Sequence, residues 1–273
     1  MNKVLPKSDR AAVSPEPALR AENVSVTYTT GAISKTVFSD LNFSMQEGEF
    51  VCIVGPSGVG KTTLLRSLSG LLTPTTGSIH VYGRKVTEPP PEIAIVFQDY
   101  SRSLLPWMNA LQNVALPLKG RKMGRKEREA KASEVLATVG LGDALHKYPW
   151  QLSGGMQQRV AIARALAYDA KILVMDEPFA SVDAQTRFEL EDLVLDLSKR
   201  LSISVIVVTH DIDEAVYLSN RVIVLSGSPA LVIDNVEIDL PFPRDQIATK
   251  GSADFSTYRG RILGEIRQSQ AKR

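Results

Sequence analysis

The most constraining feature of this sequence is a glycine-rich segment, GPSGVGKTT, at residues 55–63. An apolar run precedes it and a helical pattern follows it. The segment matches G-x-x-x-x-G-K-[ST], a pattern in which backbone N–H groups cradle phosphates. Glycines permit backbone angles that a side chain would forbid, so we expect Gly55, Gly58 and Gly60 to turn their N–H groups toward phosphate oxygens. A chance match in a glycine-rich turn is the alternative, but it leaves the strand–loop–helix context unexplained.

Each residue of this segment is a candidate contact to a nucleotide. We expect Lys61 to place its charge at the β- and γ-phosphates and the Thr62 hydroxyl to ligate Mg²⁺. The candidate nucleotide-binding residues are Gly55, Pro56, Ser57, Gly58, Val59, Gly60, Lys61, Thr62 and Thr63.

Short apolar runs alternate with helical segments, which predicts an α/β fold with a parallel sheet and helices on both faces. A mainly helical block at 101–167 is then an insertion into this core. Residues 1–19 carry three prolines and no apolar signal-peptide core, so a flexible tail is expected there. Residues 241–273 form an expected C-terminal extension with one short helix. The expected strands are 49–55, 92–98, 171–177, 204–210 and 221–227, and the expected later helices are 184–199 and 212–220.

Charge and apolar patterning exclude several classes of protein. The 273 residues carry 32 basic and 30 acidic side chains, so electrostatics give no reason to expect a nucleic-acid partner. No apolar run approaches the roughly 20 residues of a membrane-spanning helix. The single cysteine, Cys52, cannot form an internal disulfide, which fits a reducing cytoplasm.

Polar residues follow three of the expected strands. Gln98 ends IAIVFQ, Asp176 and Glu177 end ILVMDE, and His210 ends VIVVTH. Ligands of parallel α/β sheets bind outside the carboxyl ends of the strands, where these residues should meet the glycine-rich loop. Asp176 is expected to reach Mg²⁺ through water, Glu177 to deprotonate the attacking water, and His210 to contact a γ-phosphate.

Each of these residues has a simpler alternative role. Gln98 is expected to sense Mg²⁺ or the attacking water, and otherwise caps a strand. The two acids would otherwise be solvated carboxylates at a strand end, and the histidine a buried residue with satisfied hydrogen bonds.

The segment LSGGMQQRVAIARAL at 152–166 begins with Ser153, Gly154 and Gly155 at an expected helix N-terminus. A serine hydroxyl and free N–H groups there form a second anion site. One chain cannot easily bring both phosphate sites to one γ-phosphate, but two chains placed head to tail can. The alternative is an ordinary capped helix.

These segments together resemble the ATP-binding subunit of an ABC transporter, in order and spacing, over residues 20–240. The resemblance implies a P-loop NTPase (RecA-like) core with an inserted α-helical subdomain and a small N-terminal antiparallel β region. It assigns Asp183 to the loop Ser181-Val182-Asp183 that lines the dimer site. Tyr28 lies 27 residues before Gly55, where the family stacks an aromatic ring on adenine; otherwise it is a plain strand aromatic. One departure is Met156, where the commonest signature has glutamine, and Gln157 and Gln158 are expected to supply the missing polar contact.

The resemblance also implies an activity and partners. Two copies close around two ATP molecules with Mg²⁺, separate transmembrane permease subunits switch access, and hydrolysis resets them. The subunit would sit peripherally at the cytoplasmic face of the membrane. A solute-binding protein would be an indirect partner.

The stretch from Tyr100 to Met108 has exposed-looking apolar residues, including Leu104, Leu105 and Trp107. In this family it receives a helix of the permease, and packing inside the helical subdomain is the alternative. The same stretch resembles importers of the nitrate, sulfonate, taurine and bicarbonate group. The basic run at 119–131 is expected to be a solvated helical face, with lipid headgroups or the partner complex as the alternative.

Two other classes of function compete with the importer. Soluble ABC ATPases of DNA repair carry long coiled coils, but here Lys61 and Asp176 are only 115 residues apart. Ribosome-acting members usually carry two cassettes. A small-molecule kinase leaves the Ser153 segment and His210 unexplained.

Overall fold

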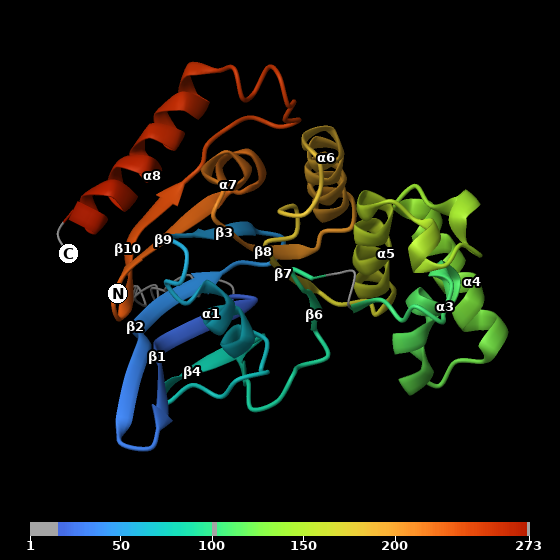
Figure 1. Ribbon diagram of the computed structural model, residues 1–273, viewed down its shortest axis with the longest axis horizontal. Coiled ribbons are helices and arrows are strands. Elements are labelled where there is room, and N and C mark those ends of the chain that lie inside the picture. Colours follow the sequence, from blue (N-terminus) through green and yellow to red (C-terminus); the bar gives the residue numbers. More distant parts are fainter. Residues whose placement is uncertain (1–15, 100–102, 272–273) are drawn as a thin grey trace, which may run out of the picture.

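The computed structural model describes residues 16–99 and 103–271, in which ten strands form one mixed sheet (Figure 1). The strand order is β5-β4-β1-β2-β10-β9-β3-β8-β7-β6. The strands are β1 (Leu19–Thr30), β2 (Ile33–Met45), β3 (Phe50–Val54), β4 (Thr76–Val81), β5 (Arg84–Lys85), β6 (Ile93–Val96), β7 (Ile172–Asp176), β8 (Ser204–Thr209), β9 (Arg221–Gly227) and β10 (Ala230–Glu237).

The half of the sheet that carries the glycine-rich loop is parallel. Strands β9, β3, β8, β7 and β6 run in one direction, and every residue of β3, β7 and β8 is buried. Continuous burial is typical of parallel strands with helices on both faces. Because the strands share a direction, their carboxyl ends lie along one edge. The expected strands at 49–55, 92–98, 171–177, 204–210 and 221–227 are confirmed, each within a few residues of its predicted bounds.

The N-terminal half of the sheet is antiparallel. β1 pairs with β2 and β4, and β4 pairs with β5. Strand β10 joins the halves, because it runs antiparallel to β9 and meets β2 where Ala230 faces Phe38. The sheet begins at Leu19, and both Ala18 and Leu19 are fully buried. The expected tail at 1–19 is therefore wrong at its C-terminal end, and its residues 1–15 lie outside the described part of the chain.

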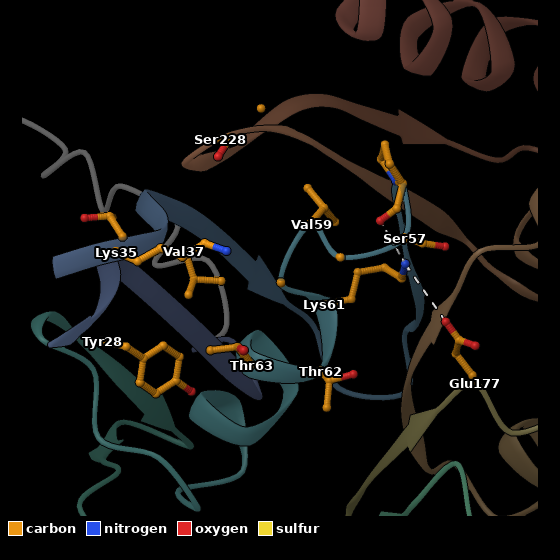
Figure 2. Close-up of a pocket in the computed structure, with 15 residues that line it drawn as sticks. Tyr28, Lys35, Val37, Ser57, Val59, Lys61, Thr62, Thr63, Glu177 and Ser228 are labelled. Atoms are coloured by element: carbon orange, nitrogen blue, oxygen red, sulfur yellow. Dashed lines mark hydrogen bonds and ion pairs between the residues drawn. The ribbon is translucent and has the colours of Figure 1, made fainter. Parts of the chain in front are cut away.

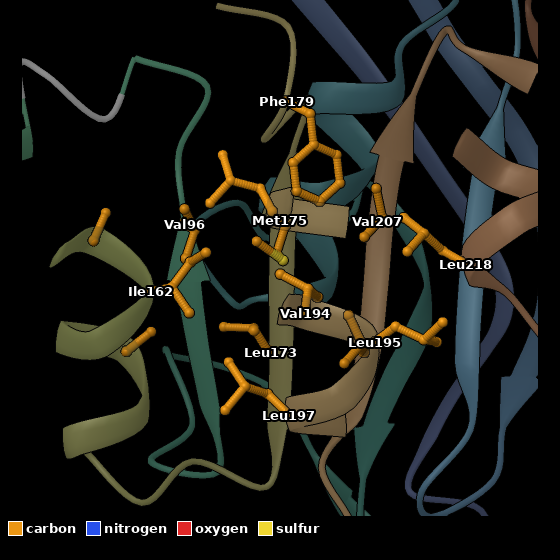
Figure 3. Close-up of a cluster of buried hydrophobic side chains, with 14 of the residues drawn as sticks. Val96, Ile162, Leu173, Met175, Phe179, Val194, Leu195, Leu197, Val207 and Leu218 are labelled. Atoms are coloured by element: carbon orange, nitrogen blue, oxygen red, sulfur yellow. The ribbon is translucent and has the colours of Figure 1, made fainter. Parts of the chain in front are cut away.

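Two apolar cores lie on opposite faces of the parallel strands, because side chains alternate along a strand. One face packs on α1 (Lys61–Leu68), through residues such as Ile53 and Val174. The other packs on α6 (Ala184–Arg200) and α7 (Ile212–Leu218). Figure 3 shows Leu173, Met175 and Val207 of this second face against Val194 and Leu195 of α6.

The helices of residues 110–167 gather at one end of the sheet (Figure 1). Gly140, with a φ of +77°, follows the end of α4 and ends the helix. The elements of this block are α3 (Ala110–Ala115), η1 (Leu116–Gly120), α4 (Arg125–Thr138), η2 (Gly142–Ala144), η3 (Pro149–Gln151) and α5 (Gly154–Ala167).

The C-terminal extension contains one helix, as expected, but that helix is long rather than short. A loop at 238–252 leads into α8 (Ala253–Ala271), which packs on α7, β9 and β10. Phe255 and Ile262 of α8 are buried. In the described residues, no helix combines the length and the apolar character that crossing a bilayer requires.

Candidate functional site

The loop between β3 and α1 adopts backbone conformations that only glycine tolerates well. Gly58 and Gly60 have φ values of +77° and +107°, in the left-handed region. Gly55 lies outside that region, so its backbone angles do not require glycine. Packing instead leaves no room for a side chain at position 55, since a Cβ there would lie 2.5 Å from the carbonyl oxygen of Leu225 in β9.

Lys61, the first residue of α1, points back into this loop. Its side chain is 6% exposed, and Nζ donates hydrogen bonds to the carbonyl oxygens of Gly55, at 2.9 Å, and Pro56, at 3.3 Å. Burial lowers the pKa of Lys61, while the carboxylates of Glu177 and Asp176 oppose that shift. The loop therefore holds an amine that a phosphate group can engage.

A cavity of about 500 Å³ opens above the loop. Figure 2 shows Tyr28 and Lys35 at one side of it and Glu177 at the other, with Lys61 between them. Tyr28 is 45% exposed and lies opposite Lys35 in the β1–β2 register. The predicted residues that line the cavity are Tyr28, Pro56, Ser57, Gly58, Val59, Gly60, Lys61, Thr62, Thr63 and Glu177.

Five further residues of the cavity wall lie outside the sequence motifs. They come from β2, the last residue of β9 and the turn that follows β9, and they belong to no local pattern. Only the pairing of β2 with β1 and β10 brings them beside the loop, where Val37 would touch any side chain at position 60. These residues are Lys35, Thr36, Val37, Gly227 and Ser228.

The donors expected to hold Mg²⁺ fit a hard cation. Asp176 ends β7 with 4% exposure, and its Oδ1 atom has no hydrogen-bond partner. Burial raises the pKa of Asp176, and the Thr62 hydroxyl beside it lowers the pKa in turn. A buried carboxylate oxygen without a partner is costly unless a cation or proton satisfies it. A carboxylate next to a hydroxyl is also the oxygen donor set that Mg²⁺ prefers.

Glu177 is the point where the polar strand ends converge. Its Oε2 accepts a hydrogen bond from Nε2 of Gln98 at 3.2 Å and lies 3.2 Å from Nδ1 of His210. Its Oε1 lies 4.0 Å from Nζ of Lys61. The φ of Glu177 is +43°, and its N–H donates to the carbonyl of Val208 at 2.8 Å. A non-glycine residue held in this conformation stores strain, a feature that clusters at functional sites.

The second expected anion site lies outside this cavity. Ser153 is an exposed N-cap of α5 and accepts from the N–H of Met156 at 3.3 Å. A side chain at Gly155 would lie 2.2 Å from Thr186 of α6. None of Ser153, Gly154, Gly155 and Asp183 lines the cavity, so within one chain the two phosphate sites stay apart.

Asp183 caps α6 in the same way that Ser153 caps α5. It accepts the N–H of Thr186 at 3.0 Å and its hydroxyl at 2.7 Å, and these bonds lower the pKa of Asp183. Since Thr186 also packs closely on Gly155, it lies between the start of α5 and the start of α6. The expectation that Gln157 and Gln158 supply the polar contact missing at Met156 is wrong. Gln157 donates to the carbonyls of Pro149 and Leu152, and Gln158 is fully buried.

A second groove, of about 490 Å³, lies on the helical block. Trp107, which is 68% exposed, lines it together with Met108 and basic residues of the 119–131 run. Leu104 is 2% exposed and packs in the apolar core, so its expected exposure is wrong. Tyr100 lies outside the described residues.

This chain is similar to known proteins in family, sequence and structure. Residues 38–180 match the family described as ABC transporter. The chain is 38% identical to the nitrate transport protein NasD of Klebsiella oxytoca, over 94% of this chain and 99% of the relative. It is 41% identical to the nitrate import ATP-binding protein NrtD of Synechococcus elongatus, over 96% of each chain. It is 42% identical to the bicarbonate transport ATP-binding protein CmpD of Synechocystis sp., over 88% of each chain.

Solved structures share the fold. The ATP-binding cassette MJ0796, solved as a dimer in a post-hydrolysis state with ADP and Pi, superposes with a TM-score of 0.72 at 34% identity. That match covers 82% of this chain and all of the cassette. CbiO1 of Clostridium perfringens, part of the transporter complex cbiONQ, gives a TM-score of 0.73 at 28% identity, over 81% of this chain and 88% of its own.

Proposed function

The chain belongs to the ABC transporter family, and from that premise we propose that it powers the import of a small oxyanion by hydrolysing ATP. Its site joins a phosphate loop to a strained glutamate that three polar side chains approach. That convergence is the observation that carries the proposal. It supplies phosphate binding and water activation in one place.

The proposed chemistry is transfer of the γ-phosphoryl group of ATP to water, giving ADP and inorganic phosphate. Glu177 accepts a proton from the attacking water, which Gln98 helps to orient. Lys61 and the loop N–H groups stabilise charge on the β- and γ-phosphates, and His210 contacts the γ-phosphate. Thr62 and Asp176 would hold Mg²⁺, with Gln98 nearby, and the ion would neutralise charge that develops on the phosphate oxygens.

A second copy of the chain completes the site. Ser153, Gly154, Gly155 and Asp183 lie at helix N-termini outside the cavity of their own chain, and all of them except Gly155 are exposed. A head-to-tail partner would place them over the γ-phosphate held by the loop, where a helix N-terminus favours an anion. Dimeric structures of MJ0796 support this arrangement.

Membrane subunits are the other proposed partners. The groove beside Trp107 and Met108 has an exposed aromatic ring and basic walls, which suits a helix of a permease. CbiO1, a structural relative, is itself part of a transporter complex. We place the subunit peripherally at the cytoplasmic face of the membrane, with a solute-binding protein as an indirect partner.

The proposed cargo is a small planar anion with a single charge. The relatives NasD and NrtD are named for nitrate and CmpD for bicarbonate, and both ions have this chemistry. Sulfonates and taurine remain predictions from the sequence of residues 97–118.

The test is ATP turnover in the assembled complex. The chain is purified with the permease that co-purifies with it, reconstituted in vesicles with the matching binding protein, and assayed with nitrate, bicarbonate, taurine and sulfate. We expect nitrate or bicarbonate to raise turnover severalfold, and Glu177→Gln complexes to stay inactive. Turnover that no anion changes would contradict the cargo, and turnover that Glu177→Gln leaves intact would contradict the mechanism.

A further inference from the structure

A buried acid lies beside the site without belonging to it. Glu214 is in the first turn of α7, and only 4% of it is exposed. It lines neither the cavity nor the groove. A buried carboxylate is kept where it makes specific contacts, because leaving it unpaired is costly.

Glu214 contacts the residues on either side of His210. The Thr209 hydroxyl donates to Oε2 of Glu214 at 2.7 Å, and the N–H of Asp211 donates to the same hydroxyl at 3.0 Å. The Asp211 carboxylate accepts in turn from the N–H of Glu214 at 3.2 Å. These bonds form a closed ring through the residues on either side of His210. The histidine side chain itself is 56% exposed, so the ring fixes the backbone from which it extends.

The ring is also tied to the start of α6. Nη1 of Arg187 lies 3.4 Å from Oδ2 of Asp211, and Nε lies 3.9 Å from Oε1 of Glu214. The N–H of Arg187 donates to the carbonyl of Asp183 at 2.9 Å. One arginine therefore links the loop that carries His210 to the helix that Asp183 caps.

From these contacts we propose that Glu214 is a positioning residue, which holds the backbone around His210 so that the imidazole reaches Glu177 and the γ-phosphate. Glu214 acts through Thr209 and Asp211 and touches no reacting atom. The inference rests on the role proposed above for His210. Its prediction is specific: losing Glu214 should slow the chemical step without weakening nucleotide binding.

The experiment compares Glu214→Leu with Glu214→Gln in the full chain. Leucine removes the acceptor for the Thr209 hydroxyl, whereas glutamine keeps one. We expect Glu214→Leu to lower kcat at least tenfold and to change the Kd for ATP by less than threefold. Glu214→Gln should keep kcat within threefold of wild type. Equal losses in both variants, or a parallel loss of ATP affinity, would overturn the proposal.

Two further variants separate positioning from general stability. Thr209→Val removes the donor of the hydrogen bond between Thr209 and Glu214, so its kcat should match that of Glu214→Leu. It replaces Glu214→Leu in the comparison if that variant fails to fold. The double variant should be no slower than either single one. Ser198→Ala removes a buried hydroxyl of α6 that donates to the carbonyl of Ile203. It is the matched control, and its kcat should equal that of wild type.

The deciding measurement repeats Glu214→Leu in a His210→Ala background. If Glu214 acts through His210, adding Glu214→Leu to His210→Ala should change the single-turnover rate less than twofold. A further tenfold loss would overturn the positioning role while leaving the role of His210 intact. A wild-type rate for His210→Ala alone would instead overturn the proposed role of His210, and the inference with it.

Discussion

Nδ1 of His210 lies 3.2 Å from Oε2 of Glu177, at the carboxyl ends of the neighbouring strands β8 and β7. The same carboxylate oxygen accepts from Gln98, which follows β6. Three adjacent parallel strands thus each deliver one polar side chain to one point. The sheet therefore brings the proposed base and the two side chains that contact it to one edge.

The first prediction concerns why position 55 is glycine. Gly55→Ala would press a methyl group against the carbonyl oxygen of Leu225, 2.5 Å away. We expect a loss of about 2–3 kcal/mol in the free energy of unfolding, towards the upper end of the usual cost of overpacking. Gly58→Ala is the control, because its Cβ meets nothing within 4 Å and only the left-handed backbone costs about 1 kcal/mol. Urea unfolding measures the free energy of unfolding of both variants. A larger loss in Gly58→Ala than in Gly55→Ala would refute the packing explanation for Gly55.

The second prediction is a pH dependence of stability that comes from Glu214. Burial, with Asp211 and Glu191 acting the same way, raises its pKa from 4.5 to about 7, while the Thr209 hydroxyl and Arg187 oppose the shift. Below about pH 4.5 the carboxyl is protonated in both folded and unfolded chains, so its contribution is fully present. That contribution is lost as the pH rises through about 7, by at most about 3 kcal/mol.

Glu214→Gln tests this dependence, since glutamine does not titrate. The free energy of unfolding of the variant minus that of wild type should increase between pH 4.5 and pH 7. Glu134→Gln, at an exposed position of α4, controls for the removal of a carboxylate. Parallel pH curves for wild type and Glu214→Gln would show that Glu214 is not the group responsible.

The third prediction tests Tyr28 as the platform for adenine. The ring lies at the far wall of the cavity from Glu177 (Figure 2) and is half-exposed. Tyr28→Ala should raise the KM for ATP about tenfold with kcat little changed, because stacking is lost from binding alone. Tyr28→Trp should restore the KM. If both variants keep the wild-type KM, the ring is a plain strand aromatic.

The fourth prediction follows from the separation of the two phosphate sites. Ser153→Ala and Lys61→Ala homodimers each spoil both composite sites, so each should turn over ATP at least tenfold more slowly than wild type. A mixed dimer keeps one intact site, so activity should return when the two variants are combined. Native mass spectrometry establishes that mixed dimers form. Formation without any recovered turnover would count against shared sites.

The sequence predicts the residues at strand ends well and the walls of the cavity poorly. The convergence of Gln98, Glu177 and His210 follows from strand direction, which apolar runs reveal. Lys35 and Ser228 reach the cavity through pairing between strands far apart in the sequence, which no local pattern records.

Three local expectations fail for related reasons. Leu104 is covered by the helical block, and Leu19 is covered by strands β2 and β4. Gly55 is required by the approach of β9 rather than by its own backbone angles. For Leu19 and Gly55 the deciding neighbours lie more than 20 residues away in the sequence, so the residues around each position cannot reveal them.

We propose that Glu177 drives hydrolysis in a site that two copies of the chain share. Light scattering of Glu177→Gln with ATP and Mg²⁺ tests it most directly, because blocked hydrolysis should trap the closed pair. We expect a mass of roughly twice 29.8 kDa with ATP and a single-chain mass with ADP. A Glu177→Gln chain that binds ATP yet remains a monomer, or that hydrolyses ATP at the wild-type rate, would contradict it.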